Sequence, residues 1–166
     1  VAKLKAEFLQ HYYDKNGIPV RSRLIANITR INQLGSIIPG ITNFFMTNNI
    51  IAPLVMKLFG FSPKRKMPKL QKTTLKNWSQ KHFEHLQPNN TKKTVYLFND
   101  EFTNFNDTDI GIKAIKLLNH LGYKIIIPKH LESGRTYLSK GLIRKAKKIA
   151  ETNIEYLKDI ISEEKP

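Results

Sequence analysis

The polar residues best placed to form a binding or docking surface lie in two short segments of the second half of the chain. The first segment carries Asp100, Thr103, Asn104 and Asn106, and the second carries Glu132, Ser133, Gly134, Arg135, Ser139 and Lys140. The chain contains no cysteine. This excludes disulfides, thiolate zinc sites, cysteine-ligated iron–sulfur clusters and thiol nucleophiles within these residues.

Each polar segment follows a short apolar run that is typical of a β-strand, at residues 95–98 and 123–127. A helix is expected between them, with Asp107 as the capping residue and Gly122 as its end. Its inward side chains are expected to be Ile110, Ala114, Leu117 and Leu118. A strand, helix and strand of this length predict a parallel pair with a right-handed crossover, and ligands bind at the carboxyl ends of parallel strands. The two polar segments should therefore lie close together.

The same polar residues also have a purely structural interpretation, which we favour for this part of the chain. Asp and Asn side chains cap helices, Gly134 adopts an unusual backbone angle, and Arg135 pairs with Asp100 or Glu132. His82 and His85, three residues apart, would supply only half of a metal site. We therefore assign no catalytic residue and no metal ligand.

Apolar periodicity predicts the remaining elements. Residues 2–15 form a helix with Leu4, Phe8 and Tyr12 on one face, ended by Asn16-Gly17, and a second helix runs from Pro19 to Gly35 with Leu24, Ile28, Ile31 and Leu34 on one face. An apolar stretch at 41–59 is interrupted by Asn48-Asn49 and Pro53, a short helix spans 75–86, and a last helix spans 139–161. The buried face of the last helix is expected to carry Leu142, Ala146, Ile149, Ala150, Ile154, Leu157 and Ile161.

These elements predict an α/β chain with a helical N-terminal half, a small parallel β-α-β unit and a long C-terminal helix. We divide it into a helical connector region (1–61), a basic linker with a short helix (62–93) and an incomplete α/β half-domain (94–166).

The net charge of the 166 residues is +15, and residues 1–90 account for +11 of it. Such a surface attracts nucleic acid or anionic lipid. Two alternative functions for the chain are therefore a basic nucleic-acid-binding module and a peripheral membrane contact. The basic stretch 64–76 lacks the interleaved aromatic residues of a single-strand platform, which argues against nucleic acid. We favour the loss of acidic neighbouring domains as the origin of the charge.

The apolar stretch 41–59 is too polar to span a bilayer and could contact a membrane surface or cause self-association.

Several short motifs of the second half together resemble a known protein family. They are residues 100–106 (DEFTNFN), 109–111 (DIG), 121–123 (LGY), Pro128, 133–135 (SGR) and 138–142 (LSKGL). They resemble the cysteine-rich C-terminal region of FAD-linked oxidases fused to iron–sulfur domains. These proteins include the D-lactate dehydrogenase and glycolate oxidase iron–sulfur proteins and, more distantly, heterodisulfide reductase. Residues 2–9 are similar to the family segment that follows the last cysteine of the ferredoxin-like domain.

The resemblance implies that electrons pass from a 2-hydroxy acid such as D-lactate or glycolate to FAD and then through 4Fe-4S clusters. The flavin and ferredoxin-like domains would precede this segment, and the second half of the cysteine-rich region would follow it. Those domains are the implied partners, and no cofactor is expected within these residues. Glu132 and Ser133 stand where the family has paired cysteines, and both are poor substitutes for thiolates at a cluster. The segment is thus expected to be an excised, noncatalytic portion of a cytoplasmic or membrane-associated oxidoreductase.

Overall fold

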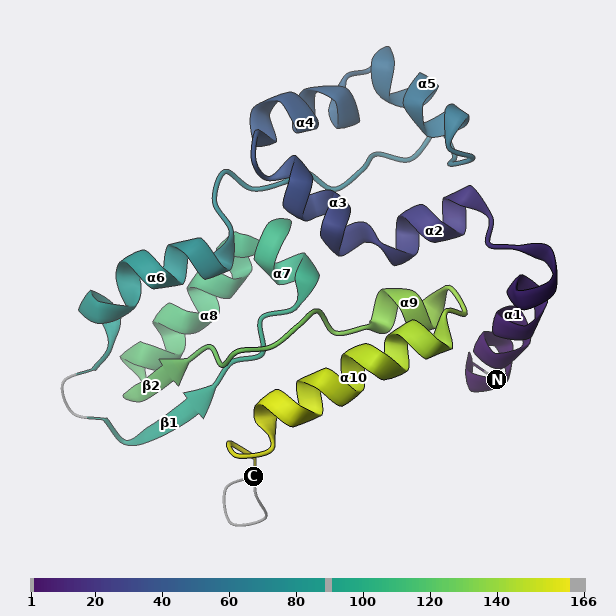
Figure 1. Cartoon of the computed structure of the whole chain (residues 1–166). Helices are drawn as coiled ribbons and strands as arrows, with labels where there is room; N and C mark the ends of the chain where they lie inside the picture. The colour runs from purple at the N-terminus through teal and green to yellow at the C-terminus, as the bar shows by residue number, and fades with distance from the viewer. Residues whose placement is uncertain (1, 89–90, 162–166) are drawn as a thin grey trace.

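The computed structural model describes residues 2–88 and 91–161, which form a mostly helical chain with a small sheet (Figure 1). The first half contains α1 (Ala2–Asn16), α2 (Val20–Ala26), α3 (Ile28–Gly35), α4 (Pro39–Thr47) and α5 (Ile51–Leu58). The second contains α6 (Leu75–Leu86), β1 (Lys93–Tyr96), α7 (Glu101–Phe105), α8 (Thr108–His120), β2 (Tyr123–Ile126), α9 (Arg135–Ser139) and α10 (Ile143–Leu157). The predicted α/β fold, helical first and β-α-β second, is confirmed.

The sheet positions the two polar segments. β1 and β2 are parallel, with Val95 opposite Ile125, and α8 connects them. Because side chains alternate along a strand, every second residue of each strand faces the same way, and this face packs against α6 and α8. At its centre Leu75, Ile115 and Ile125 are at most 1% exposed. The two strands therefore end side by side over one packed core.

A second, smaller core joins the two halves of the chain. Ala26 of α2 packs there with Tyr137 of α9 and with Leu142. Figure 1 shows α9 directly below α2, although more than 100 residues separate them in sequence. This contact fixes the loop after β2 relative to the N-terminal helices.

The prediction of one helix from Pro19 to Gly35 is wrong, because the chain bends at Asn27. The side-chain Nδ2 of Asn27 donates to the carbonyl of Arg23 at 2.7 Å, while its Oδ1 accepts from the hydroxyl of Tyr137 at 2.9 Å. An Asn side chain that competes for backbone groups weakens a helix. The hydrogen bond from Tyr137 of α9 holds the Asn27 side chain in this position. Apolar spacing alone could not reveal this contact.

The last predicted helix, 139–161, is also wrong in its bounds, since the structure has α9 and α10 with a break between them. Gly141 lies in this break with a φ of +74°, a conformation that L residues with a side chain rarely adopt. A Cβ at Gly141 would also collide with Leu9 of α1. The break therefore lets α1 pack against this corner.

Several apolar side chains on the predicted helix faces are exposed. They are Leu4, Phe8 and Tyr12 of α1, Leu34 of α3, Ile110 and Leu117 of α8, Ile154 of α10, and Ile161, all between 49% and 70% exposed. Ala150 is exposed as well. Periodicity identifies a face that is suited to packing, but it does not show whether a partner is present. In residues 2–88 and 91–161, no element covers these side chains.

The basic segment between α5 and α6 contains no helix or strand, as predicted, yet part of it is firmly attached. Asn43 of α4 exchanges two hydrogen bonds with the backbone of Leu70, each 2.8 Å long. The Leu70 side chain is 7% exposed. The segment is thus a strap over the helices at Leu70, while the proposed domain boundaries stay a prediction.

Candidate functional site

The loop after β1 is fixed by a capping carboxylate. Asp100 precedes α7, and its Oδ1 accepts the backbone N–H groups of Phe102 at 3.0 Å and Thr103 at 2.7 Å. An aspartate at this position satisfies amide groups that have no partner within the helix. The predicted capping role is confirmed for Asp100. It is wrong for Asp107, which lies before α8 but makes no side-chain hydrogen bond to it.

The loop after β2 turns into α9 at Gly134. This glycine has a φ of +75°, so the unusual backbone angle predicted there is confirmed. The turn places Ser133 and Arg135 against the beginning of α7. The two polar segments therefore meet, as the strand order predicted.

Five residues form what we call the strand-end cluster: Asp100, Glu101, Phe102, Ser133 and Arg135. The carboxylate of Glu101 accepts the backbone N–H of Ser133 at 3.0 Å and its hydroxyl at 2.8 Å. Arg135 lies 2.7 Å from Asp100 and 3.4 Å from Glu101, and its guanidinium lies 4.7 Å from the centre of the Phe102 ring. The predicted pairing of Arg135 with Asp100 is confirmed.

The side chain of Glu101 is fully buried, which would be costly for an unpaired carboxylate. Its hydrogen bonds from Ser133 and its proximity to Arg135 supply the compensation. For Asp100, burial alone would raise the pKa. Hydrogen bonds from Thr103 and then the charge of Arg135 outweigh burial and lower the pKa below its usual value. Asp100 therefore suits a charged structural role.

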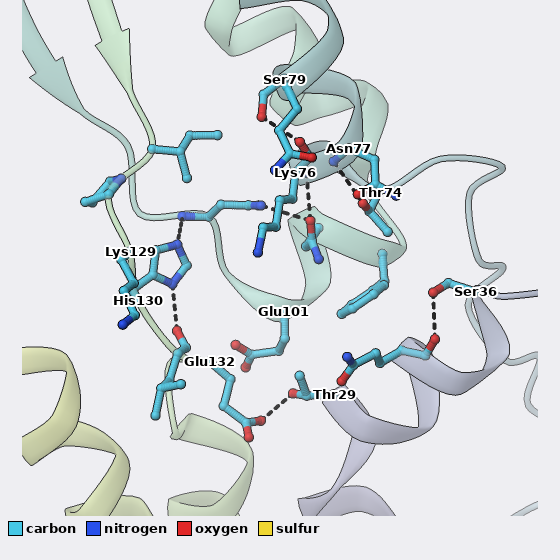
Figure 2. Close-up of a pocket in the computed structure, with 18 of the residues that line it drawn as sticks. Thr29, Ser36, Thr74, Lys76, Asn77, Ser79, Glu101, Lys129, His130 and Glu132 are labelled. Atoms are coloured by element: carbon cyan, nitrogen blue, oxygen red, sulfur yellow. Dashed lines mark hydrogen bonds between the residues drawn. The ribbon is translucent and has the colours of Figure 1, made fainter. Parts of the chain in front are cut away.

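Beside the strand-end cluster lies an open groove of about 1430 Å³, which we call the strand-end groove. Figure 2 shows His130 and Glu132 on one side, Thr29 and Ser36 on the other, and Glu101 between them. Glu132 accepts a hydrogen bond from the hydroxyl of Thr29 in α3. Burial, together with the charge of Glu132, raises the pKa of Tyr137, and Arg30 partly opposes this shift.

Basic side chains dominate the charge of the groove. Its lining includes six cationic residues, Arg30, Lys76, Lys124, Lys129, Lys145 and Lys148, against the two carboxylates of Glu101 and Glu132. Within the described parts of the chain, none of these six forms an ion pair. The groove is thus electrostatically suited to a negatively charged partner surface.

His130 has a defined tautomer, which hydrogen bonding assigns. Its Nε2 accepts the backbone N–H of Asn99 at 3.2 Å, so Nδ1 carries the proton that is donated to the carbonyl of Leu131 at 2.6 Å. The ring also stacks on Phe98, with 4.2 Å between ring centres. His130 therefore connects the two loops.

The remaining predicted site residues have structural partners or lie elsewhere. Asn104 Oδ1 accepts the N–H of Lys76 and the side chain of Asn99, and buried Asn106 bonds to Asn32 and to the backbone of Lys69. Ser139 and Lys140 lie at the other end of α9 from Gly134, outside the strand-end cluster.

Glu101 and His130 are not among the site residues predicted from the sequence. Glu101 directly follows the capping Asp100, and this position offered a signal, because an acid in the first turn of a helix is favourable. His130 gave no signal, since its partners are a backbone N–H and an aromatic ring on another segment.

The described residues contain no group of three His, Cys, Asp or Glu side chains that could hold a metal ion. No helix in residues 2–88 or 91–161 is both long and apolar enough to cross a membrane.

Comparison with known proteins found relatives of one kind. The chain is 24% identical over 163 residues to a D-2-hydroxyglutarate dehydrogenase of Escherichia coli, and 23% identical over 166 residues to that of Pantoea ananatis. A D-2-hydroxyglutarate dehydrogenase of Haemophilus influenzae is 22% identical over 163 residues. Each alignment covers 95% of this chain but only 16% of the relative. No family model matches the chain, and no solved structure is significantly similar to it.

The chain thus spans about one sixth of the length of these relatives. The similarity is thus to one kind of 2-hydroxy acid dehydrogenase. It extends through the helical first half, which the motif-based resemblance matched only in part.

Proposed function

We propose that these 166 residues are a noncatalytic structural or docking portion of a larger FAD- and iron–sulfur-dependent oxidoreductase. Its substrate would be a 2-hydroxy acid such as D-2-hydroxyglutarate, D-lactate or glycolate. The observation that carries this proposal is the end-to-end alignment, 95% of this chain, with three dehydrogenases of such an acid. A similarity limited to one short motif would cover a much smaller share of the chain.

The noncatalytic role is supported by the partners of the residues that replace the family's paired cysteines. Glu132 accepts a hydrogen bond from Thr29, and Ser133 donates to Glu101. Iron–sulfur clusters require thiolate or, less often, imidazole ligands, and these hard oxygen atoms do not fit one. We derive no electron-transfer step through this position. Ser133 instead connects the loop after β2 to the loop after β1 through Glu101.

The exposed apolar faces and the excess positive charge support a docking role. Phe8, Ile110 and Leu117 are each at least 59% exposed, and the net charge is +15. Exposed apolar side chains on a helix face are suited to contact with another surface, and basic surfaces associate with acidic ones. Flavin and ferredoxin-like domains of the same protein are the proposed neighbours.

The proposal can be tested with the longer protein that contains these residues. The purified protein should contain flavin and iron, and D-2-hydroxyglutarate, D-lactate or glycolate should reduce an artificial electron acceptor in its presence. The substitutions Ser133→Ala and Glu132→Gln should leave the iron content per molecule unchanged. A longer protein without flavin or without 2-hydroxy acid oxidation would refute the function. Loss of iron in either variant would refute the noncatalytic role.

A second candidate function is contact with a membrane surface through α4 and α5. The apolar side chains of these helices and their flanks are unusually exposed: Phe44 and Phe45 by 54% and 47%, and Ile50, Leu54 and Leu58 by 66% to 80%. The basic strap follows directly, and interfacial binding combines apolar insertion with attraction to anionic lipid. Flotation with vesicles containing phosphatidylserine tests it. Co-migration of the unsubstituted protein with the vesicles that is lost in Leu54→Ser/Leu58→Ser would support this candidate. If the unsubstituted protein does not co-migrate with the vesicles, the candidate is excluded.

A further inference from the structure

The outer edge of β2 is closed by a side chain. Gln87 follows α6, and its Nε2 donates to the backbone oxygen of Ile125 at 2.8 Å. Its Oε1 accepts the backbone N–H of the same residue at 3.0 Å. A neighbouring strand would pair with these two backbone groups. The amide of Gln87 therefore occupies the place of a strand at the middle of β2.

This clamp also defines which backbone groups of β2 face β1. Since Ile125 directs its N–H and C=O toward Gln87, the alternation along a strand directs those of Lys124 and Ile126 toward β1. The hydrogen bond from Leu97 N–H to the oxygen of Ile126, 2.8 Å long, agrees with this assignment.

The outer edge of β1 is open. In the parallel register Val95 lies opposite Ile125 and directs its backbone groups toward β2, so Thr94 and Tyr96 direct theirs away from the sheet. No hydrogen bond to these outward groups occurs in the part of the chain that the structure describes. β1 is also the more exposed strand, and the side chain of Tyr96 is 47% exposed.

Parallel sheets are normally buried on both faces, and an edge strand presents unpaired N–H and C=O groups that can pair with another strand. The element after β2 indicates where the next strand comes from. Neighbouring parallel strands need a crossover of a dozen or more residues, and α10 provides a helix of 15 residues. In Figure 1, α10 begins beyond the carboxyl ends of the strands and runs in the direction opposite to both of them.

We infer that a third strand, supplied by polypeptide that follows residue 166 in the longer protein, pairs in parallel with the outer edge of β1. The order of the sheet is then β2, β1 and the added strand, with α10 as the crossover helix. This inference rests on the proposed function, because it requires the relatives' greater length. The net charge of +15 opposes edge-to-edge pairing between two copies of the chain.

Photo-crosslinking in the longer protein tests the inference. p-Benzoylphenylalanine replaces Tyr96 in one variant and Thr94 in another, and the crosslinked residues are identified by mass spectrometry. Both should crosslink to one segment beyond residue 166, with the Thr94 product about two residues earlier in that segment than the Tyr96 product. Tyr12 provides the matched control, since it is 49% exposed but lies on α1, and its variant should not label that segment.

Every other crosslinking result overturns the inference: attachment to a second copy, to another protein or to a segment before residue 1, a reversed order of the two products, or no product. Hydrogen exchange in the unsubstituted longer protein gives a second readout. The amides of Tyr96 and Val95 should both exchange on the order of 100-fold more slowly than an unprotected amide. Fast exchange at Tyr96 beside slow exchange at Val95 would also overturn it.

The two proposals fail separately. If the longer protein oxidises a 2-hydroxy acid but gives none of the expected crosslinks, only the third strand is wrong. If the crosslinks form in a protein without flavin or oxidase activity, only the proposed function is wrong.

Discussion

Ser133 donates both its backbone N–H and its hydroxyl to the carboxylate of Glu101, at 3.0 Å and 2.8 Å. The two residues come from the loops after β2 and β1, so this double hydrogen bond connects the carboxyl ends of both strands. It forms at the position where the family resemblance would place cysteine ligands. Here the local chemistry holds two loops together through a buried carboxylate.

Removal of this carboxylate should therefore destabilise the chain. Glu101→Ala leaves the N–H and hydroxyl of Ser133 without their acceptor in a partly buried site, at an expected cost of about 1–3 kcal/mol in the free energy of unfolding. Urea denaturation measures this cost. Glu7→Ala is the control, because Glu7 is an exposed acid in the interior of α1, and it should change stability by less than about 0.5 kcal/mol. Equal effects of the two substitutions would contradict the assigned role of Glu101.

The lowered pKa of Asp100 predicts a dependence of stability on pH. A carboxyl group whose pKa is lower in the folded than in the unfolded chain stabilises the fold above the unfolded value, near 3.8. This contribution is lost as the pH falls from that value through the lower folded pKa. Asp100→Asn should therefore flatten the decline in the free energy of unfolding below about pH 4.

The measurement is a series of urea denaturations between neutral and acidic pH. Asp159→Asn serves as the exposed comparison, because Asp159 lies in the turn after α10, and it should leave the slope close to that of the unsubstituted chain. A slope that is unchanged in Asp100→Asn would show that the capping and ion-pair contacts of Asp100 do not stabilise the fold.

Local sequence signals predicted the elements of the second half well. The run at 123–127 identified β2, and the run at 95–98 identified β1 two residues too late, because the exposed first half of β1 is polar. The predicted helix 75–86 matched α6 residue for residue. The meeting of Asp100 with Arg135 followed from the parallel topology and the two loop positions. These features depend on interactions that are close in sequence or on a general rule of sheet topology.

The features that sequence could not predict depend on distant partners. The bend at Asn27 requires Tyr137, the break at Gly141 requires Leu9, and the edge of β2 is closed by Gln87. Each is a contact between segments with no shared periodicity. Exposed residues such as Ile110 and Leu117 were predicted to pack inward because an amphipathic pattern gives a face but not its partner.

Two glycines on helices should respond to alanine in opposite directions. A Cβ at Gly111 of α8 would collide with Leu75 and lie 2.9 Å from Thr103 Cγ2. Leu75 is fully buried and cannot move aside freely. We expect Gly111→Ala to cost about 1–3 kcal/mol from overpacking, more than the gain of up to about 1 kcal/mol in helix propensity.

Gly40 of α4 is the matched control, since a Cβ there would meet no atom within 4 Å. Gly40→Ala should raise the free energy of unfolding by about 0.5–1 kcal/mol. Thermal and urea denaturation of both variants measure the difference. Stabilisation by Gly111→Ala would contradict the close packing of α8 on α6.

The clamp of Gln87 on β2 should contribute directly to stability. Ile125 is 1% exposed, so Gln87→Ala leaves its N–H and C=O with little access to water, and we expect a loss of about 1–3 kcal/mol in the free energy of unfolding. Gln87→Glu keeps the acceptor but places a carboxylate against the carbonyl of Ile125, and it should lose at least as much. Gln80→Ala is the control, because Gln80 is an exposed residue of α6. If urea denaturation gave the same stability for Gln87→Ala and Gln80→Ala, Gln87 would not act as a substitute for a strand.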